Sequence, residues 1–347
     1  MRRITDQFGV SDAQRPNRRE FIAAAGAAVA FLPWGARSAL AAEMPSFSAP
    51  PLTNPQTLDI KSDNSQGFIQ LDPDRDYLIR IGRDTGGVIV RHALRLRGGR
   101  NVVVIGGCIK RAPDTPTNSA DGTKTRFPGE LFNIDGHSGT AYVEGLVIDN
   151  GDNYGVDGIH VGNSDGTYVF RNIHVRGVTG SKTGNHADGL QIIGAVNMLL
   201  IDGMTIYSTY QGMNIQSEFP IGYAWLRNCN TRYPNPDFRS GSANGYSFWL
   251  GGDNTSPKLN HPAKYKFDNV YVEERTHFWD LSWENGSIGP PAKEPRGCRL
   301  VAGHPDWAEF PSFNVEGHVA KGIPPGGDFC TVDRILNSAG VVSYQAI

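Results

Sequence analysis

The chain has 347 residues, of which 42 are glycine and 22 are proline, and its formal net charge at pH 7 is −2. Turn-forming residues at this density exclude long helices, and the near-neutral charge argues against nucleic acid or an anionic membrane surface as a partner. A hydrophobic content of 39% is enough for one sizeable core, so we expect a single domain.

The N-terminus resembles a twin-arginine export signal. Residues 17–22 read Asn-Arg-Arg-Glu-Phe-Ile, an alanine-rich apolar run follows over 23–32, and Ala39-Leu40-Ala41 has the small-x-small pattern of a cleavage site. The apolar run is too short to remain as a membrane span. We therefore expect an export signal over residues 1–41, the twin-arginine export machinery as the partner of the precursor, and a periplasmic or secreted mature protein without a permanent membrane span.

Short strands are predicted after an N-terminal arm over residues 42–69, which begins with a stretch rich in proline and serine. Two of these strands flank the glycine corner Gly106-Gly107. Residues 112–128 contain prolines and an Asp-Gly pair and predict a loop that leaves the regular structure, and loops of this size often carry binding function. Strands are predicted to resume over 131–134 and 142–148.

One pattern then appears three times, over residues 157–161, 188–192 and 211–215. Each copy is a polar residue and a glycine followed by alternating apolar and polar residues, and each is followed by a second strand, at 172–175, 202–206 and 228–231. Repetition at a period of roughly 23–31 residues indicates a solenoid, and alternation with a period of two indicates that it is built of strands.

The regular pattern weakens toward the C-terminus. After a predicted loop over 233–239, strands are expected over 245–250, 265–272 and 278–283. The tail over 286–347 should pack along or cap the coil, because an open end would leave an unpaired strand edge. Cys298 and Cys330 lie in this tail, and the sequence leaves open whether they pair in an oxidising compartment.

The repeats and the glycine corner resemble the pectate-lyase-like superfamily over residues 70–285. The resemblance implies an all-β fold, a right-handed parallel β-helix (a single-stranded solenoid) with long loops and an irregular C-terminal tail. This superfamily includes polysaccharide lyases, glycoside hydrolases, epimerases and non-catalytic adhesins. The Asn-Thr-Asp and Gly-Asp-Asp signatures of its polygalacturonase-like hydrolases and the arginine-centred motif of its best-known pectate lyases do not occur in this sequence. No catalytic residue is therefore carried over from the family.

Two polar columns are predicted beside the first strand of each repeat. In a parallel coil, equivalent residues stack about 4.8 Å apart, and side chains alternate between the core and the outside. The outward column contains His160, Gln191, Asn214 and Ser247. The corner column contains Asp157, Asp188, Gln211 and Asn244.

These columns predict a site on one face of the coil. Carboxylates one repeat apart suit either an acid and nucleophile pair or a hard cation such as Ca²⁺, with Asp157, Asp188 and Glu218 as ligands. The catalytic candidates are His186, Asp188, Asp157 and Lys182, and the candidate substrate contacts are His160, Gln191, Asn214, Gln216 and Tyr210. The alternative is structural, because Asp and Asn commonly cap the turns of a solenoid.

The second strands predict a rival face. Arg176, Tyr207 and Arg232 should point outward as a ladder, with Arg239 near a loop end, and guanidinium groups match the carboxylates of an acidic polysaccharide. The alternative is a solvated sheet face with cation–π contacts.

Three functions follow from these patterns. The first is an exported polysaccharide lyase that cleaves a uronic-acid polymer by β-elimination, the second a glycoside hydrolase using Asp157 and Asp188, and the third a non-catalytic carbohydrate-binding or envelope protein. The sequence favours the first and leaves all three open.

Overall fold

A computed structural model describes most of the chain from residue 45 to residue 338. The described residues are 45–63, 65, 67–83, 85–113, 129–151, 156–162, 164–180, 186–215, 221–233, 248–249, 263–273, 288–289, 299–301, 304–306 and 313–338. The predicted export signal lies outside them, as do Lys182, Gln216, Glu218, Arg239 and Cys298. No helix of the described residues is long and apolar enough to cross a membrane.

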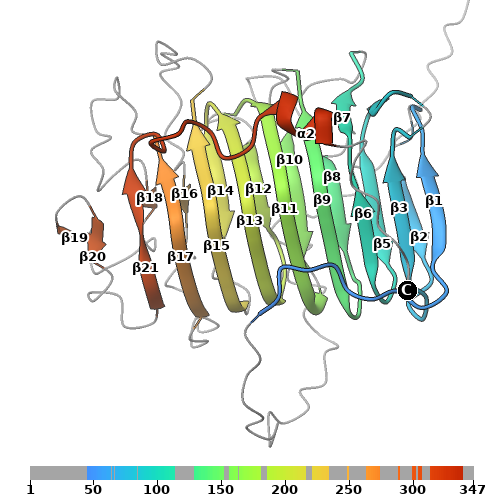
Figure 1. The fold of residues 1–347 in the computed structure, drawn as a ribbon, viewed down its shortest axis with the longest axis horizontal. Coiled ribbons are helices and arrows are strands. Elements are labelled where there is room, and N and C mark those ends of the chain that lie inside the picture. Colours follow the sequence, from blue (N-terminus) through green and yellow to red (C-terminus); the bar gives the residue numbers. More distant parts are fainter. Residues whose placement is uncertain are drawn as a thin grey trace, which may run out of the picture. The chain divides into compact units, whose positions relative to one another are not determined.

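The fold is all-β and is dominated by two large parallel sheets (Figure 1). Sheet A has the order β1 (Gln56–Ile60), β3 (Tyr77–Ile81), β6 (Val102–Ile105), β9 (Thr140–Asp149), β11 (Ser164–Val178), β13 (Val196–Ser208), β15 (Ile221–Arg232), β17 (Ala263–Val272) and β21 (Phe313–Lys321), and β4 (Val88–Arg91) and β7 (Cys108–Arg111) lie off this path. Sheet B has the order β18 (Ile288–Gly289), β16 (Phe248–Trp249), β14 (Gln211–Ile215), β12 (Asp188–Ile192), β10 (Asp157–Gly162), β8 (Glu130–Asp135), β5 (Leu94–Gly98) and β2 (Phe68–Leu71). A small antiparallel pair, β19 (Arg299–Val301) and β20 (His304–Asp306), and the helix α2 (Val332–Ser338) complete the elements.

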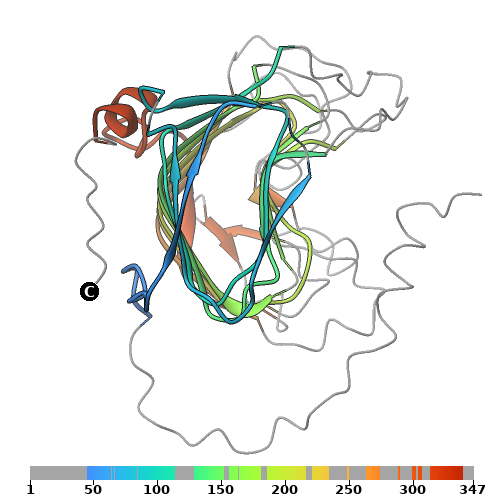
Figure 2. The same ribbon diagram turned by 90° about the vertical axis from the view of Figure 1, so that its right-hand side faces the viewer.

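From β8 onward the chain visits the two sheets alternately, so each repeat contributes one strand to each sheet. Figure 2 shows the sheets on two sides of a common interior. Buried apolar side chains from both sheets fill that interior, among them Ile159 and Leu190 of sheet B and Ile173 and Met204 of sheet A. The strand ladder runs from Gln56 to Lys321 and therefore extends beyond both ends of the predicted range 70–285.

The register confirms that the three predicted copies stack. Ile159 pairs with Leu190, and Leu190 pairs with Met213. The glycines of the pattern are needed for this stacking: a Cβ on Gly158 would lie 2.6 Å from the carbonyl oxygen of Gly189, and also 2.5 Å from Val175 Cγ1 in the facing sheet. No side chain fits between the sheets at these positions.

The predicted extension of the outward column to Ser247 is wrong. Asn214 pairs with Trp249, two residues further along the chain. A shift of two residues keeps the same side chains facing inward, so alternation alone could not reveal it. Ser247 and Asn244 lie outside the described residues.

Sheet A contains a break in the extended backbone at the same level of five adjacent strands. The residues there have positive φ and are Gly145, Asn172, Gly203, Asn228 and Asn269, whereas Gly317 of β21 has positive φ but pairs with Phe267, two residues before that level. Only glycine and asparagine occur at these positions, because a side chain branched at Cβ is strained in the left-handed region. This conformation explains why the second strand of each repeat carries Asn or Gly.

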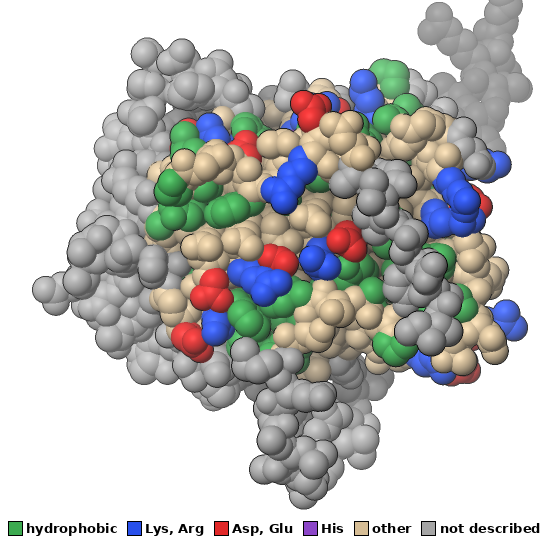
Figure 3. All heavy atoms as spheres, viewed as in Figure 1, with side chains coloured by type: hydrophobic (Ala, Val, Ile, Leu, Met, Phe, Trp, Pro, Cys, Tyr) green, Lys and Arg blue, Asp and Glu red, His purple; other side chains and the backbone are tan. Residues whose placement is uncertain are grey.

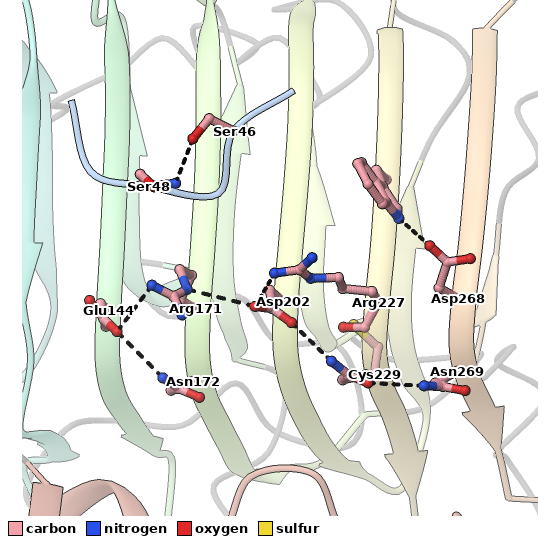
Figure 4. Close-up of polar contacts among 12 residues, drawn as sticks. Ser46, Ser48, Glu144, Arg171, Asn172, Asp202, Arg227, Cys229, Asp268 and Asn269 are labelled. Atoms are coloured by element: carbon pink, nitrogen blue, oxygen red, sulfur yellow. Dashed lines mark hydrogen bonds and ion pairs between the residues drawn. The ribbon is translucent and has the colours of Figure 1, made fainter. Parts of the chain in front are cut away.

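The residue before each break carries a charge that alternates from strand to strand. Register places Glu144, Arg171, Asp202, Arg227 and Asp268 side by side in that order. Arg227 Nη2 lies 2.7 Å from Asp202 Oδ2 (Figure 4). Figure 3, which shows the face seen in Figure 1, has acidic and basic side chains next to one another across its middle. These partly exposed pairs each contribute only about 0–1 kcal/mol to stability.

The N-terminal arm packs on the outside of sheet A. Phe47 and Leu52 form a second apolar cluster with Val103, Tyr142, Val169 and Leu200 of four successive strands. The ring of Phe47 meets that of Trp225 edge-on, with centroids 5.0 Å apart. Figure 4 shows the arm, marked by Ser46 and Ser48, in front of the strands of this sheet.

The C-terminal tail also packs along sheet A. The backbone N–H of Cys330 donates to Thr205 Oγ1 at 3.1 Å, and its carbonyl oxygen lies 2.9 Å from His174 Nδ1. Cys330 packs with Val147 and Ile335 as a buried free thiol, so it forms no disulfide bond with Cys298. Burial raises the pKa of the Cys330 thiol to about 12.

Candidate functional site

The outer face of sheet B carries a column of polar side chains from five adjacent strands. Register pairs Arg95 with Asn133, Asn133 with His160, His160 with Gln191, and Gln191 with Asn214. Since neighbouring strands lie about 4.8 Å apart, the column extends across the strands for about 19 Å. The predicted stacking of His160, Gln191 and Asn214 is therefore present, and Arg95 and Asn133 extend it by two strands.

A second row lies at the start of the same strands. Glu130, Asp157, Asp188 and Gln211 are the first residues of β8, β10, β12 and β14. Glu130 pairs with Asp157, and Asp188 pairs with Gln211. Three carboxylates thus stand on three successive strands, next to the imidazole of His160.

Contacts between the two rows form one continuous chain, which we call the sheet B ladder: Arg95, Glu130, His160, Asp157, Asp188 and Asn214. Arg95 Nη2 lies 2.6 Å from Glu130 Oε1, and Glu130 Oε2 lies 3.6 Å from His160 Nδ1. The other ring nitrogen of His160 contacts Asp157 Oδ2. Asp157 Oδ1 accepts the backbone N–H of Asp188 at 2.7 Å, and Asn214 Nδ2 donates to Asp188 Oδ2 at 3.2 Å.

The ladder is buried although its side chains face away from the core. Asp188 is 0% exposed, Asp157 3%, and Glu130 and His160 4% each. Charged groups tolerate such burial only when they are paired and hydrogen-bonded. The ladder provides this pairing, because the cation Arg95, the anion Glu130, the imidazole of His160 and the anion Asp157 follow one another. His160, predicted as a substrate contact, has both ring nitrogens directed at carboxylates of the chain itself.

Three carboxamide oxygens in the column have no hydrogen-bond partner among the described residues: Asn133 Oδ1, Gln191 Oε1 and Asn214 Oδ1. The orientation of the Asn214 amide follows from its neighbour, because its nitrogen must be the atom that faces the carboxylate of Asp188. These oxygens are buried, so a ligand could reach them only if the groups that cover them moved.

His186 and Tyr210 lie beside one another at the corner where β12 and β14 begin. His186 precedes the first residue of β12 by two positions, and Tyr210 directly precedes β14. Their rings are 5.4 Å apart with an interplanar angle of 39°. His186 is exposed and Tyr210 is 3% exposed, so an imidazole that solvent can reach stands against a buried phenol.

The predicted cation site stays a prediction. Among the residues that the structure describes, no group of three or more His, Cys, Asp and Glu side chains could hold a metal ion. Both oxygens of Asp157 contact donors of the chain itself. Glu218, the third predicted ligand, lies outside the described part. We therefore derive no chemical step through a cation.

The rival face on sheet A binds carboxylates, but they belong to the chain. Arg176 Nη2 lies 2.7 Å from Asp149 Oδ2, and Arg232 Nη1 lies 3.0 Å from Asp328 Oδ1 in the C-terminal tail. Tyr207 also donates its hydroxyl to Asp328. Burial, followed by this hydrogen bond and the charge of Asp328, raises the pKa of Tyr207 to about 12.

The geometry of that face differs from the predicted Arg-Tyr-Arg ladder in one respect. Tyr207 pairs with Arg232, and its ring centroid lies 5.6 Å from the guanidinium carbon. A register shift between Val175 and Val178 interrupts the ladder on the side of Arg176. In the described part of the chain, this face is the surface on which the tail docks.

Sequence reasoning missed Arg95, Glu130 and Asn133 as members of the site. The signal was a weaker fourth copy of the repeat over residues 130–134, with Leu131 in place of the glycine and the same order of polar and apolar residues. Because Leu131 stands where the other copies have glycine, the pattern predicts only a strand at this copy.

Comparison with known proteins adds no family: no protein-family model matches the chain, and no curated protein or solved structure matches it significantly.

Proposed function

We propose that this chain is an exported polysaccharide lyase that cleaves a uronic-acid polymer by β-elimination at the outer face of sheet B. We also propose that its two parallel sheets close into a right-handed β-helix. The alternation of the chain between the sheets and the parallel pairing of every repeat support this closure. An experimental structure with left-handed crossovers, or with sheets that do not enclose the core, would contradict it.

The adjacency of His186 and Tyr210 carries the proposed reaction. A β-elimination needs a base for the proton on C5 of the uronate and an acid for the leaving oxygen. In the proposed step, His186 takes the C5 proton, the electron pair forms the C4–C5 double bond, and the C4–O bond breaks as Tyr210 protonates the departing oxygen. Tyr210 is 3% exposed in the free chain, so this step requires the groups that cover its hydroxyl to move when substrate binds. In the same proposal, the half-buried Gln191 of the same strand, β12, donates its amide N–H to the uronate carboxylate.

The polar column supports a polysaccharide as the ligand. Its carboxamide oxygens at Asn133, Gln191 and Asn214 repeat along the stacked strands, as the hydroxyl groups of a glycan repeat along its chain. Because these oxygens are buried in the free chain, a glycan that crosses the strands would bind them only after the groups that cover them move. Nothing in the composition calls for a nucleic-acid partner.

The test is a product assay on the purified full chain. Polygalacturonate, alginate and polyglucuronate are incubated with the protein, and the ultraviolet absorbance of the conjugated double bond is followed. His186→Gln and Tyr210→Phe should each lower the rate by about 10²- to 10⁴-fold. Tyr271→Phe, on the outer face of sheet A, is the matched control and should leave it unchanged. Absence of unsaturated product from every polyuronate would refute the lyase.

One observation favours a second candidate, a glycoside hydrolase. Asp157 and Asp188 stand on neighbouring strands about 4.8 Å apart, close to the roughly 5–5.5 Å that separates the carboxyl groups of retaining enzymes. New reducing ends without ultraviolet absorbance, lost in Asp188→Asn, would identify this reaction. Glycan binding without any turnover would instead identify a non-catalytic carbohydrate-binding protein.

Export by the twin-arginine machinery, with a periplasmic or secreted mature protein, belongs to the same proposal. It is supported by Arg18 and Arg19, the apolar run behind them and the small residues around position 40. Replacement of both arginines by lysine should retain the precursor in the cytoplasm of an expressing bacterium. Unchanged export of that variant would refute export by the twin-arginine machinery.

A further inference from the structure

The sheet B ladder ends on the backbone that carries His186. Asp157 Oδ1 accepts the backbone N–H of Asp188 at 2.7 Å, and Asp188 lies two residues after His186. The position of the Asp157 carboxylate therefore influences where β12 begins and how His186 meets Tyr210. Asp157 is itself held by His160, which contacts its other oxygen.

Glu130 is the next member of this chain, one strand further from His186. Its Oε2 lies 3.6 Å from His160 Nδ1, so the imidazole is placed between two carboxylates, one on β8 and one on its own strand. The other oxygen of Glu130 is 2.6 Å from Arg95 Nη2 on β5, which compensates its charge. Side-chain exposure falls from 21% at Arg95 to 6% at Glu130 and 5% at His160.

We propose that Glu130 and Arg95 are positioning residues, which orient His160 and Asp157 and thereby hold the backbone at Asp188 so that His186 faces Tyr210. The expected effect on the reaction rate rests on the proposed function, whereas the expected effect on the position of His186 does not. Neither side chain needs to touch the substrate. Their effect passes through contacts that cross four adjacent strands, from β5 through β8 and β10 to the start of β12.

The same two strands offer a matched control. Arg97 on β5 and Asp135 on β8 form an equivalent pair, with Arg97 Nε 3.0 Å from Asp135 Oδ1. Asp135 pairs with Gly162, at the other end of β10 from Asp157. Asp135→Asn therefore removes a buried carboxylate from an arginine pair in the same sheet without touching His160.

The experiment compares Glu130→Gln with Asp135→Asn by NMR of histidine side chains and by kinetics on the full chain. In Glu130→Gln, the ring resonances of both His160 and His186 should shift, because His160 loses a carboxylate neighbour and His186 changes its position against the ring of Tyr210. On the polyuronate that the wild type cleaves, kcat should fall about 10- to 100-fold while KM changes less than about twofold. In Asp135→Asn neither histidine should shift and kcat should stay unchanged.

A shift of His160 without any shift of His186 in Glu130→Gln would overturn the inference, and so would equal effects of the two variants. If Glu130→Gln does not fold, Arg95→Met provides the test, because it keeps an unbranched aliphatic side chain and removes the guanidinium group that pairs with Glu130 and lies 5.0 Å from the ring centroid of Phe68. An unchanged His186 resonance in Arg95→Met would also overturn the inference. Absence of lyase activity in the wild type would refute the proposed function, whereas the NMR comparison would still decide the positioning role.

Discussion

The stacked glycines allow a quantitative test of how closely the two sheets approach. A Cβ added at Gly189 would lie 2.2 Å from Ile206 Cγ2 and 2.8 Å from the carbonyl oxygen of Gly212. Ile206 is 0% exposed and has a stiff, β-branched side chain, and the carbonyl belongs to the neighbouring strand β14, so neither atom can move cheaply. We expect Gly189→Ala to lower the free energy of unfolding by about 1–3 kcal/mol, at the upper end of that range because one of the two clashes is with backbone.

Thermal unfolding followed by circular dichroism measures this effect. A loss of 1 kcal/mol lowers Tm by about 2–4 °C in a chain of 150–250 residues, and by somewhat less in a longer one. Gly326→Ala is the control, since Gly326 is exposed in the tail, has no described atom within 4 Å of the added Cβ, and does not lie in the left-handed region. An unchanged Tm for Gly189→Ala would show that the sheets do not meet as closely as described.

Three further predictions concern backbone conformation and pH. Asn228 has a φ of 53°, so Asn228→Ala should cost about 1–2 kcal/mol and Asn228→Gly much less, and equal denaturation midpoints would contradict the left-handed conformation. Burial lowers the pKa of His137 from 6.5 to about 4, so the unfolded chain binds the proton first and stability should fall as pH drops from about 6.5 to about 4; His137→Gln should flatten this dependence in a series of Tm measurements. The pKa of Tyr207 is raised to about 12, so its contribution to stability should be lost as pH rises from about 10 to about 12. Asp328→Asn should bring the spectrophotometric titration of Tyr207 to lower pH. An unchanged titration would show that Asp328 of the tail does not accept a hydrogen bond from Tyr207.

The repeats could be predicted because their signal is local. Alternation with a period of two fixed which side chains of each strand face the core, and the glycines marked where one copy stands on the next. The stacking of residues 158, 189 and 212 followed from these two observations alone. The predicted register failed at Trp249, where a shift of two residues leaves the inward face unchanged, and beside Arg176, where the ladder shifts between Val175 and Val178.

The contacts on the outside of sheet A could not be predicted in the same way. Phe47 packs against Trp225, and Asp328 binds Tyr207 and Arg232, across separations in sequence of about a hundred residues or more. No periodicity connects such segments, because each contact is made once. The sequence pattern of the outer face of sheet A therefore predicted a surface that binds carboxylates. It did not show that the chain itself supplies the carboxylate, from Asp328.

The candidate site combines both kinds of information, which is why it was predicted only in part. The repeat placed Asp157, Asp188 and His160 on neighbouring strands, but not the order in which their atoms meet. That order depends on Glu130, whose copy of the repeat lacks the glycine and whose carboxylate reaches the far side of the imidazole. Once Glu130 is included, the two ring nitrogens of His160 are both directed at the chain, and the exposed imidazole of His186 becomes the one that a substrate can reach. In the proposed lyase, the buried histidine supports the site and the exposed histidine takes part in the reaction.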